Sequence, residues 1–127
     1  MLGKGIVLAY DMTEGASFEE VKNYHQFISS KNNNSKIMIL GNKLDLELRR
    51  EVNKETALEY CKNFNCDYME VSALSGENIH ESFECLTRKI ILNLEKVFLQ
   101  VVLVVKEFGF IIFYGLKYLF IRKIINR

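Results

Sequence analysis

The stretch KIMILGNKLD, residues 36–45, decides how this sequence folds. Its apolar part, residues 36–40, is followed at once by the polar residues Asn42, Lys43 and Asp45. A short continuous apolar run is typical of a strand that is covered on both faces of a parallel sheet. The polar residues would then lie at the carboxyl end of that strand, which is where parallel sheets bind their ligands.

Apolar runs and helical patterns alternate on both sides of this stretch. Residues 5–10 and 68–71 are two more short apolar runs, and each predicts a strand. Ser17 begins a helical pattern, and Glu20 three residues later completes the pattern of a capping box. Asn53 is predicted to cap a second helix, and the turn LSGEN leads into a third. The apolar positions of the three helices are Phe18, Val21, His25 and Ile28; Ala57, Tyr60, Cys61 and Phe64; and Ile79, Phe83, Leu86, Ile90 and Leu94.

This order of elements predicts an α/β fold with a three-stranded parallel sheet in chain order. Strands that alternate with helices pair in parallel through right-handed crossovers. We expect the strand at 36–41 to lie in the middle. Two helices should cover one face of the sheet and the third helix the other, because successive crossovers that step in one direction stay on one side.

Composition favours a single globular domain in a reducing compartment. The chain has 127 residues, 49% of them hydrophobic and 26% charged, and a net charge of +1, which favours neither disorder nor nucleic-acid binding. Cys61, Cys66 and Cys85 form no CxxC pair and no metal-ligand spacing, and the start lacks a signal-peptide pattern. We therefore expect a cytoplasmic protein that is not secreted. His25 and His80 are isolated from other catalytic residue types and are expected to be exposed helix residues.

The loop behind the middle strand has the residue types that can read a purine. A carboxylate such as Asp45 can accept two parallel N–H bonds from one edge of guanine, whereas adenine presents no such pair of donors. The alkyl stem of Lys43 can lie along the base, and the amide of Asn42 can tie the loop to its neighbours. Backbone N–H groups at Ser72 and Ala73, behind the third strand, could meet the purine carbonyl.

These motifs together resemble the guanine-reading half of a Ras-superfamily small GTPase. The resemblance rests on NKLD at 42–45 followed by EVSALSGENI at 70–79 and covers residues 5 to about 96. The Rab branch is the most similar, on the stretches GIVLAYDMTEGASFEEV, LDLELRREV and NIHESFECL. By this resemblance the guanine site comprises Asn42, Lys43, Asp45, Ser72, Ala73 and Leu74, the last at a position where many relatives have lysine. The alternative is a turn without a ligand.

The phosphate-binding half of such a protein has no counterpart here. Small GTPases hold phosphates on a GxxxxGK[ST] loop whose Ser or Thr binds Mg²⁺, and GKG at 3–5 does not fit that pattern. The switch threonine, the DxxG loop and the catalytic glutamine are also missing. The resemblance therefore implies a partial P-loop NTPase-type G domain, its carboxyl-terminal half at residues 1–96, with no catalytic residue and no metal ligand. GTP or GDP binding should be weak or lost, and GTP hydrolysis should be absent.

Residues 97–127 form a hydrophobic, basic tail that is predicted to be helical. This segment has five basic side chains and one acidic one, and it contains no cysteine for lipidation. Three interpretations remain open. The tail could be a membrane segment, a continuation of the last helix that packs against other residues, or an aberrant translated sequence.

Two functional hypotheses follow. The first is a small GTP-binding protein of Rab type, whose family binds and hydrolyses GTP, serves in vesicle traffic and meets effectors and exchange factors. It would lie in the cytoplasm or on the cytoplasmic face of an endomembrane. The second is a non-catalytic interaction module that is attached to a membrane or completed by a partner.

Overall fold

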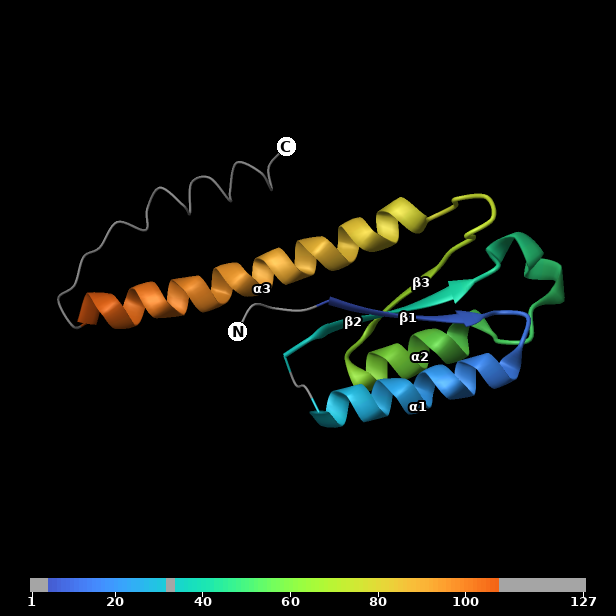
Figure 1. The fold of residues 1–127 in the computed structure, drawn as a ribbon, viewed down its shortest axis with the longest axis horizontal. Coiled ribbons are helices and arrows are strands. Elements are labelled where there is room, and N and C mark those ends of the chain that lie inside the picture. The colour runs from blue at the N-terminus through green and yellow to red at the C-terminus, as the bar shows by residue number, and fades with distance from the viewer. Residues whose placement is uncertain (1–4, 32–33, 108–127) are drawn as a thin grey trace.

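The computed structural model describes residues 5–31 and 34–107 (Figure 1). In chain order the elements are β1 (Gly5–Asp11), α1 (Gly15–Lys31), β2 (Lys36–Asn42), the short 3₁₀ helix η1 (Leu44–Arg49), α2 (Lys54–Phe64), β3 (Asp67–Glu70) and α3 (Ile79–Glu107). The predicted alternation of strands and helices is confirmed, with β3 beginning and ending one residue earlier than the sequence pattern indicated.

The three strands form one parallel sheet in the order β1-β2-β3, so the prediction that β2 lies in the middle is confirmed. Asp11 of β1 pairs in register with Asn42 of β2, and Gly41 of β2 pairs with Glu70 of β3. The carboxyl ends of all three strands therefore meet at one edge of the sheet. The polar loops leave the sheet from this edge.

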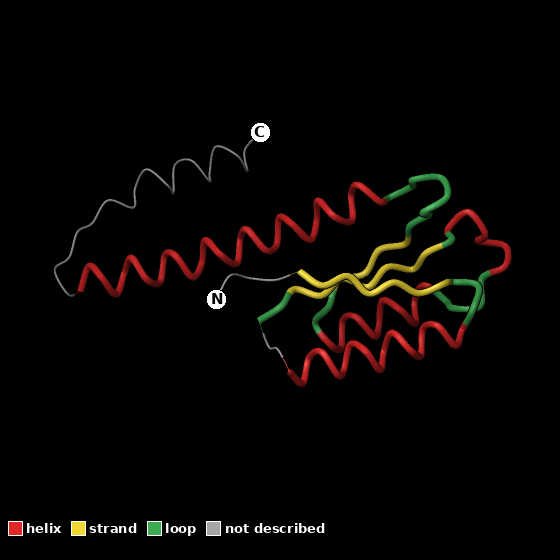
Figure 2. The backbone as a smooth tube through the Cα atoms, viewed as in Figure 1, coloured by secondary structure: helices red, strands yellow, loops and turns green. Residues whose placement is uncertain are grey.

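Helices α1 and α2 cover one face of the sheet and α3 covers the other, as predicted (Figures 1 and 2). Burial of apolar side chains stabilises both interfaces. The core on the α1 and α2 face contains Tyr10, Met12, Phe18, Val21, Ile39, Val52, Ala57 and Cys61. The smaller core on the α3 face contains Met38, Leu40, Val71 and Leu86.

Gly41, the residue before the polar loop, is required by close packing. A Cβ atom at this position would lie 2.8 Å from the Tyr68 hydroxyl and 3.0 Å from the Tyr10 hydroxyl. The two tyrosines hydrogen-bond to each other at 2.8 Å. This pair therefore lies directly over the end of β2 and leaves no room for a larger residue.

The predicted capping box at Ser17 and Glu20 is wrong. Helix α1 begins at Gly15, two residues earlier, so Ser17 lies inside its first turn. The Ser17 hydroxyl donates to the Glu14 carbonyl at 2.7 Å and accepts the backbone N–H of Asp11 at 3.0 Å. The Ser17 side chain therefore contacts the end of β1 instead of capping the helix. At the second predicted cap, Asn53 does precede α2, but its side chain makes no capping hydrogen bond.

The expectation that His25 is exposed is also wrong. Its side chain is only 2% exposed, and Nδ1 lies 2.9 Å from the Tyr60 hydroxyl. Its ring meets the rings of Tyr60 and Phe64 edge to face. Burial lowers the pKa of His25, so the neutral imidazole is the favoured form. His80, by contrast, is exposed as expected.

Two apolar residues that the helical patterns directed inward are about half exposed. They are Phe64 at the end of α2 and Phe83 in the second turn of α3. Phe64 still packs its ring against Tyr60, with the ring centroids 4.6 Å apart. The pattern therefore identified the correct face of each helix but overestimated how much of that face is covered.

Helix α3 continues beyond the sheet to Glu107, which confirms a carboxyl-terminal helix over the first part of the tail. Within residues 5–31 and 34–107, no helix is both long enough and apolar enough to span a membrane. The remainder of the predicted tail, residues 108–127, lies outside the described residues.

Candidate functional site

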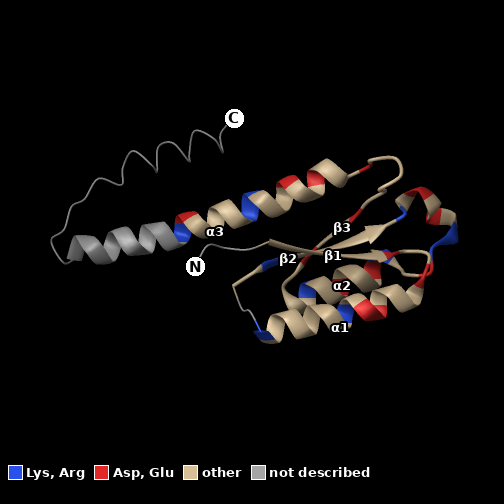
Figure 3. Ribbon diagram, in the orientation of Figure 1, with Lys and Arg blue, Asp and Glu red and all other residues tan. Residues whose placement is uncertain are grey.

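The residues that the sequence assigned to base recognition come together at the carboxyl edge of the sheet. Asn42 is the last residue of β2, and Asp45 lies in η1 just behind it. Ser72 to Leu74 follow β3 on the neighbouring loop. In Figure 3, charged residues gather on η1 and the loops beside it, whereas the strands are mostly uncharged. Two loops from adjacent strands thus form one polar surface.

A left-handed turn at Lys43 starts η1. Lys43 has φ 71° and ψ 38°, a conformation that a non-glycine residue adopts only where contacts support it. The next residue, Leu44, donates its backbone N–H to the Val71 carbonyl at 3.0 Å. This bond ties the loop after β2 to the end of β3, so the spacing between the two loops is held by the backbone.

The Asp45 carboxylate is held by the Ser72 hydroxyl. Ser72 is fully buried, and its Oγ lies 2.5 Å from Asp45 Oδ1. The same Oγ accepts the backbone N–H of Ser75 at 3.1 Å, so its own proton is directed to Asp45. Within the described part of the chain, no group bonds to the second carboxylate oxygen of Asp45.

The amide of Asn42 links its loop to the Ala73 backbone. Asn42 Oδ1 accepts the Ala73 N–H at 3.0 Å, while the Ser72 N–H donates to the Glu77 carbonyl at 3.0 Å. Both N–H groups that the sequence offered to a purine carbonyl thus donate within the chain. The carboxylate of Asp45 is the group of this set with an oxygen left to accept a ligand.

Lys43 pairs with Asp11 at the end of β1. Its Nζ lies 2.5 Å from Asp11 Oδ2, and Thr13 donates both its backbone N–H and its hydroxyl to Asp11 Oδ1. The bond from Lys43, followed by those from Thr13, lowers the pKa of Asp11 to about 2. The ion pair fixes the direction of the lysine stem, which remains about half exposed.

An ion pair between Arg50 and the buried Glu70 supports both loops. Arg50, just behind η1, binds the Glu70 carboxylate through two nitrogens at 2.7 and 3.1 Å. Tyr68 donates its hydroxyl to the same carboxylate at 3.0 Å. Burial alone would raise the pKa of Glu70, but the Arg50 and Tyr68 bonds outweigh it, and the pKa is lowered. Glu70 is therefore a buried carboxylate with every oxygen engaged.

Comparison with known proteins supplies the family. The family model described as "Ras family" matches residues 2–92, which is more than half of the chain. The chain belongs to the Ras family. It is 40% identical to Ras-related protein Rab-13 of Canis lupus familiaris over 92 residues, which cover 70% of this chain and 44% of that protein. It is 41% identical to Ras-related protein SEC4 of Candida albicans (strain WO-1) over 80 residues, which cover 62% of this chain and 38% of that protein.

A third relative, Ras-like protein 1 of Saccharomyces cerevisiae, is 37% identical over 90 residues, which cover 69% of this chain and 29% of that protein. The chain therefore spans less than half the length of the curated relatives it matches. The predicted resemblance to a Rab-like member of the Ras superfamily is confirmed.

Sequence reasoning missed three charged residues of this Ras-family site. Asp11, Arg50 and Glu70 hold the loops that the motifs identified. A signal was present for two of them, because Asp11 and Glu70 each end a strand at the same sheet edge as Asn42. Nothing in the local pattern pointed to Arg50, which reaches Glu70 across twenty positions of sequence.

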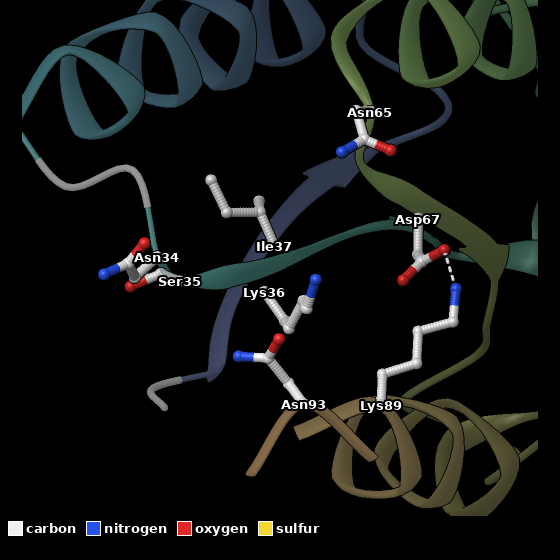
Figure 4. A pocket seen from close by; sticks show the side chains of 8 residues that line it. All are labelled: Asn34, Ser35, Lys36, Ile37, Asn65, Asp67, Lys89 and Asn93. Carbon is white, nitrogen blue, oxygen red and sulfur yellow. Dashed lines mark hydrogen bonds and ion pairs between the residues drawn. The ribbon is translucent and has the colours of Figure 1, made fainter. Parts of the chain in front are cut away.

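A separate polar pocket of about 210 Å³ lies at the opposite end of the sheet (Figure 4). Its lining includes Lys36 at the start of β2, Asp67 at the start of β3, and Lys89 and Asn93 of α3. Lys89 and Asp67 form an ion pair across it. Its lining contains none of the residues that the sequence assigned to the base site.

No group of three or more His, Cys, Asp or Glu side chains is arranged to hold a metal ion among the described residues. Asp11 and Asp45, the carboxylates of the site, are each held by a donor from the protein itself. Among the described residues of this edge, the exposed carboxylate of Asp45 has one oxygen without a partner from the chain.

Proposed function

We propose that this chain is the base-recognising half of a Rab-type GTP-binding protein. The observation that carries the proposal is the Asp45 carboxylate, whose Oδ1 is fixed by the Ser72 hydroxyl at 2.5 Å. Its Oδ2 has no partner within residues 5–31 and 34–107. A carboxylate oxygen has two lone pairs, so Oδ1 can accept one base N–H beside Ser72 while Oδ2 accepts the other.

Such a carboxylate selects guanine over adenine. Guanine presents two N–H donors side by side, which match the two oxygens of Asp45. Adenine has no such pair and would leave a desolvated carboxylate oxygen without a partner, which costs about 1–3 kcal/mol.

Two side chains are placed to cover the faces of the base. Leu74 is 86% exposed on the loop after β3, and the stem of Lys43 is held by its pair with Asp11. Apolar atoms above and below a planar ring strengthen its binding through burial. Asn42 contributes indirectly, since its amide holds the Ala73 backbone.

Binding should depend on the base and not on the phosphates. The sequence contains no GxxxxGK[ST] loop, whose backbone N–H groups and lysine hold the phosphates in complete members of the family. We therefore expect guanosine and GDP to bind this chain about equally and weakly, and GTP not to be hydrolysed. In the complete family member, GTP and Mg²⁺ would supply the remaining contacts.

The direct test follows the backbone amides of Asn42 and Ala73 by NMR in the full chain. Guanosine and GDP should shift both amides at similar concentrations, and ADP should leave them unchanged. Equal shifts with ADP, or none with either guanine compound at millimolar concentration, would contradict the proposal.

Asp45→Asn is the matched substitution. It replaces one acceptor oxygen by an N–H₂ donor that faces a guanine N–H, so guanosine binding should weaken by about 1–3 kcal/mol. Xanthine has a carbonyl in place of the guanine amine, and the variant should accept it better than the native chain does. Glu47→Gln removes the same charge two positions further along η1 and should change neither preference. Grafting the amino-terminal half of an intact small GTPase onto both variants would raise the affinities into an easily measured range.

We further propose the setting of a Rab-type switch in vesicle traffic, on the cytoplasmic face of an endomembrane. Effectors and exchange factors would then be its protein partners, and residues 97–127 its candidate membrane contact. A lipid-vesicle flotation assay on chains with and without residues 97–127 tests that contact.

A second candidate, a module completed by a partner, is favoured by the outer edge of β1. Met12 directs its N–H toward β2, so the alternate residues Gly5, Val7 and Ala9 direct theirs outward. No other described strand pairs with this edge. The Ser17 side chain takes the outward N–H of Asp11, which limits the open edge to residues 5–9.

Such an open edge can pair with an added strand through its backbone groups. Mixing the full chain with the amino-terminal half of a small GTPase should slow amide hydrogen exchange at Val7 and Ala9. Val7→Pro removes one outward N–H donor and should therefore prevent this protection. The variant should still fold, because proline is tolerated on an edge strand. Unchanged exchange at both amides would rule out the module.

A further inference from the structure

Cys61 and Cys66 lie on either side of the turn that joins α2 to β3. Asn65 ends the helix in the left-handed conformation, with φ 54° and ψ 42°. The backbone N–H groups of Asn65 and Cys66 both reach the carbonyl of Cys61, the latter at 3.0 Å. The bond from Cys66 is the six-to-one bond of a Schellman motif, and the bond from Asn65 is the five-to-one bond of an αL cap. Such helix ends often bring the side chains at the two ends of the turn into contact.

Cysteine occupies both of these contact positions. Cys61 is 3% exposed, and Cys66 is partly buried against the same core. The Cys61 thiol donates to the Asp67 carbonyl, with the sulfur 3.8 Å from the oxygen, and its interaction with Cys66 together with burial raises the pKa of the Cys61 thiol. Interaction with Cys61 lowers the pKa of the Cys66 thiol, so the more accessible cysteine is the better nucleophile. The third cysteine, Cys85, packs on the α3 side of the sheet and cannot reach either.

We propose that Cys61 and Cys66 form a reversible disulfide when the protein meets a peroxide. The Cys66 thiolate attacks hydrogen peroxide and becomes a sulfenic acid, and the peroxide's other oxygen leaves as water. The Cys61 sulfur then attacks Cys66, the S–S bond forms, and the second oxygen leaves as water with the Cys61 proton. The two thiols lose two hydrogens and two electrons, which reduce one peroxide to two waters.

The bond would fasten the end of α2 to the start of β3, the strand that leads into the Ser72 loop. In a reducing compartment such a disulfide forms transiently and signals oxidation. The proposal is independent of guanine recognition, because it concerns a turn at the opposite end of β3.

The sequence makes the test straightforward. Lys62 lies between the two cysteines, so trypsin separates them unless a disulfide joins the two peptides. The full chain carrying Cys85→Ser is treated with hydrogen peroxide under native conditions, blocked with iodoacetamide and digested. The peptides that carry Cys61 and Cys66 should be found joined, and dithiothreitol should separate them. In the native chain, two of the three thiols should be lost.

Two further chains complete the design. Cys66→Ser should keep its remaining thiols under the same treatment, because the reactive partner is gone. The Cys85→Ser chain unfolded in urea should form the link more slowly than the folded chain, because the turn no longer holds the sulfurs together. Unjoined peptides, oxidation of Cys66 to a sulfinic acid without a link, or equally fast linking in urea would each overturn the proposal.

Discussion

Two carboxylates at the carboxyl edge of the sheet are held in opposite ways. Glu70 is 7% exposed and has both oxygens bound, by Arg50 and Tyr68. Asp45 is exposed and has one oxygen bound, by Ser72. The first arrangement joins two segments of the fold, and the second leaves an acceptor open to a ligand. The same chemical group thus supports the loops in one place and has a free acceptor oxygen, which we propose binds a base, in the other.

The comparison predicts that loss of a partner costs stability at Glu70 and costs binding at Asp45. Buried charges are expensive when unpaired, because water no longer solvates them. An exposed carboxylate that loses one donor remains solvated, and only its orientation changes.

Arg50→Met should have the largest effect. It removes the two short bonds to the buried Glu70 carboxylate and leaves only the more distant Lys54, whose Nζ lies 3.9 Å from Oε2, as a cation. The free energy of unfolding should fall by about 3 kcal/mol. Adding Glu70→Gln should restore part of the loss, because a neutral amide is cheaper to bury. Urea unfolding measures both.

Arg88→Met is the matched control for that experiment. Arg88 pairs with Glu84 one helical turn away, and both side chains are more than half exposed. Its loss should cost only about 0.3–0.5 kcal/mol. Equal losses from Arg50→Met and Arg88→Met would show that the Glu70 pair has no structural importance.

Ser72→Ala, which acts on the exposed carboxylate of Asp45, should have the next largest effect. The variant keeps the fold and loses the hydroxyl that orients Asp45, so guanosine binding should weaken by about 1–2 kcal/mol. Ser82→Ala is the control, because Ser82 is equally buried and its hydroxyl bonds only to its own helix, at the Ile79 carbonyl. A larger loss of guanosine binding in Ser82→Ala than in Ser72→Ala would contradict the role given to Ser72.

Most of the fold could be predicted because its signals are local. The apolar runs and helical patterns gave the element order, and the order gave the parallel sheet with β2 in the middle. The errors arose where a distant residue intervened. The Ser17 and Glu20 pattern predicts a capping box, yet the Ser17 hydroxyl accepts the N–H of Asp11 in the preceding strand. The isolation of His25 from other catalytic residue types predicts an exposed side chain, but His25 lies on the apolar stripe of its own helix and is buried.

The site was only partly predictable for the same reason. The motifs placed Asn42, Asp45 and Ser72 at one edge, since the carboxyl ends of parallel strands coincide. The pairing of Arg50 with Glu70 depends on the path of the chain after η1, and no spacing rule encodes that path. Likewise, the use of the Ala73 N–H by Asn42 is a contact between two loops that the sequence alone does not orient.

The buried side chain of His25, apart from the two carboxylates, also makes the stability depend on pH. Burial lowers its pKa below the ordinary value of about 6.5. The unfolded chain therefore binds more protons than the folded chain at pH values just below 6.5. Stability from this residue is fully present above that pH and is lost as the pH falls toward the folded pKa.

The free energy of unfolding should fall as the pH is lowered from 7 to 5.5 because of His25. His25→Phe should remove this slope, since the ring still packs beside Tyr60 and Phe64. His80→Gln, which changes an exposed histidine, should leave the slope intact. A slope that survives His25→Phe would mean that another group titrates.

Asp11, at the end of β1, gives the smallest effect. Its pair with Lys43 is short, but the lysine side chain is 47% exposed, so the pair should contribute less than about 1 kcal/mol. The pKa of Asp11 is lowered to about 2, first by Lys43 and then by Thr13. Its contribution is therefore present above the unfolded value of about 3.9 and is lost as the pH falls through about 2. Carboxyl NMR titration should show that Lys43→Met raises the pKa of Asp11 more than Thr13→Val does. The reverse order would mean that Thr13, and not Lys43, holds the end of β1.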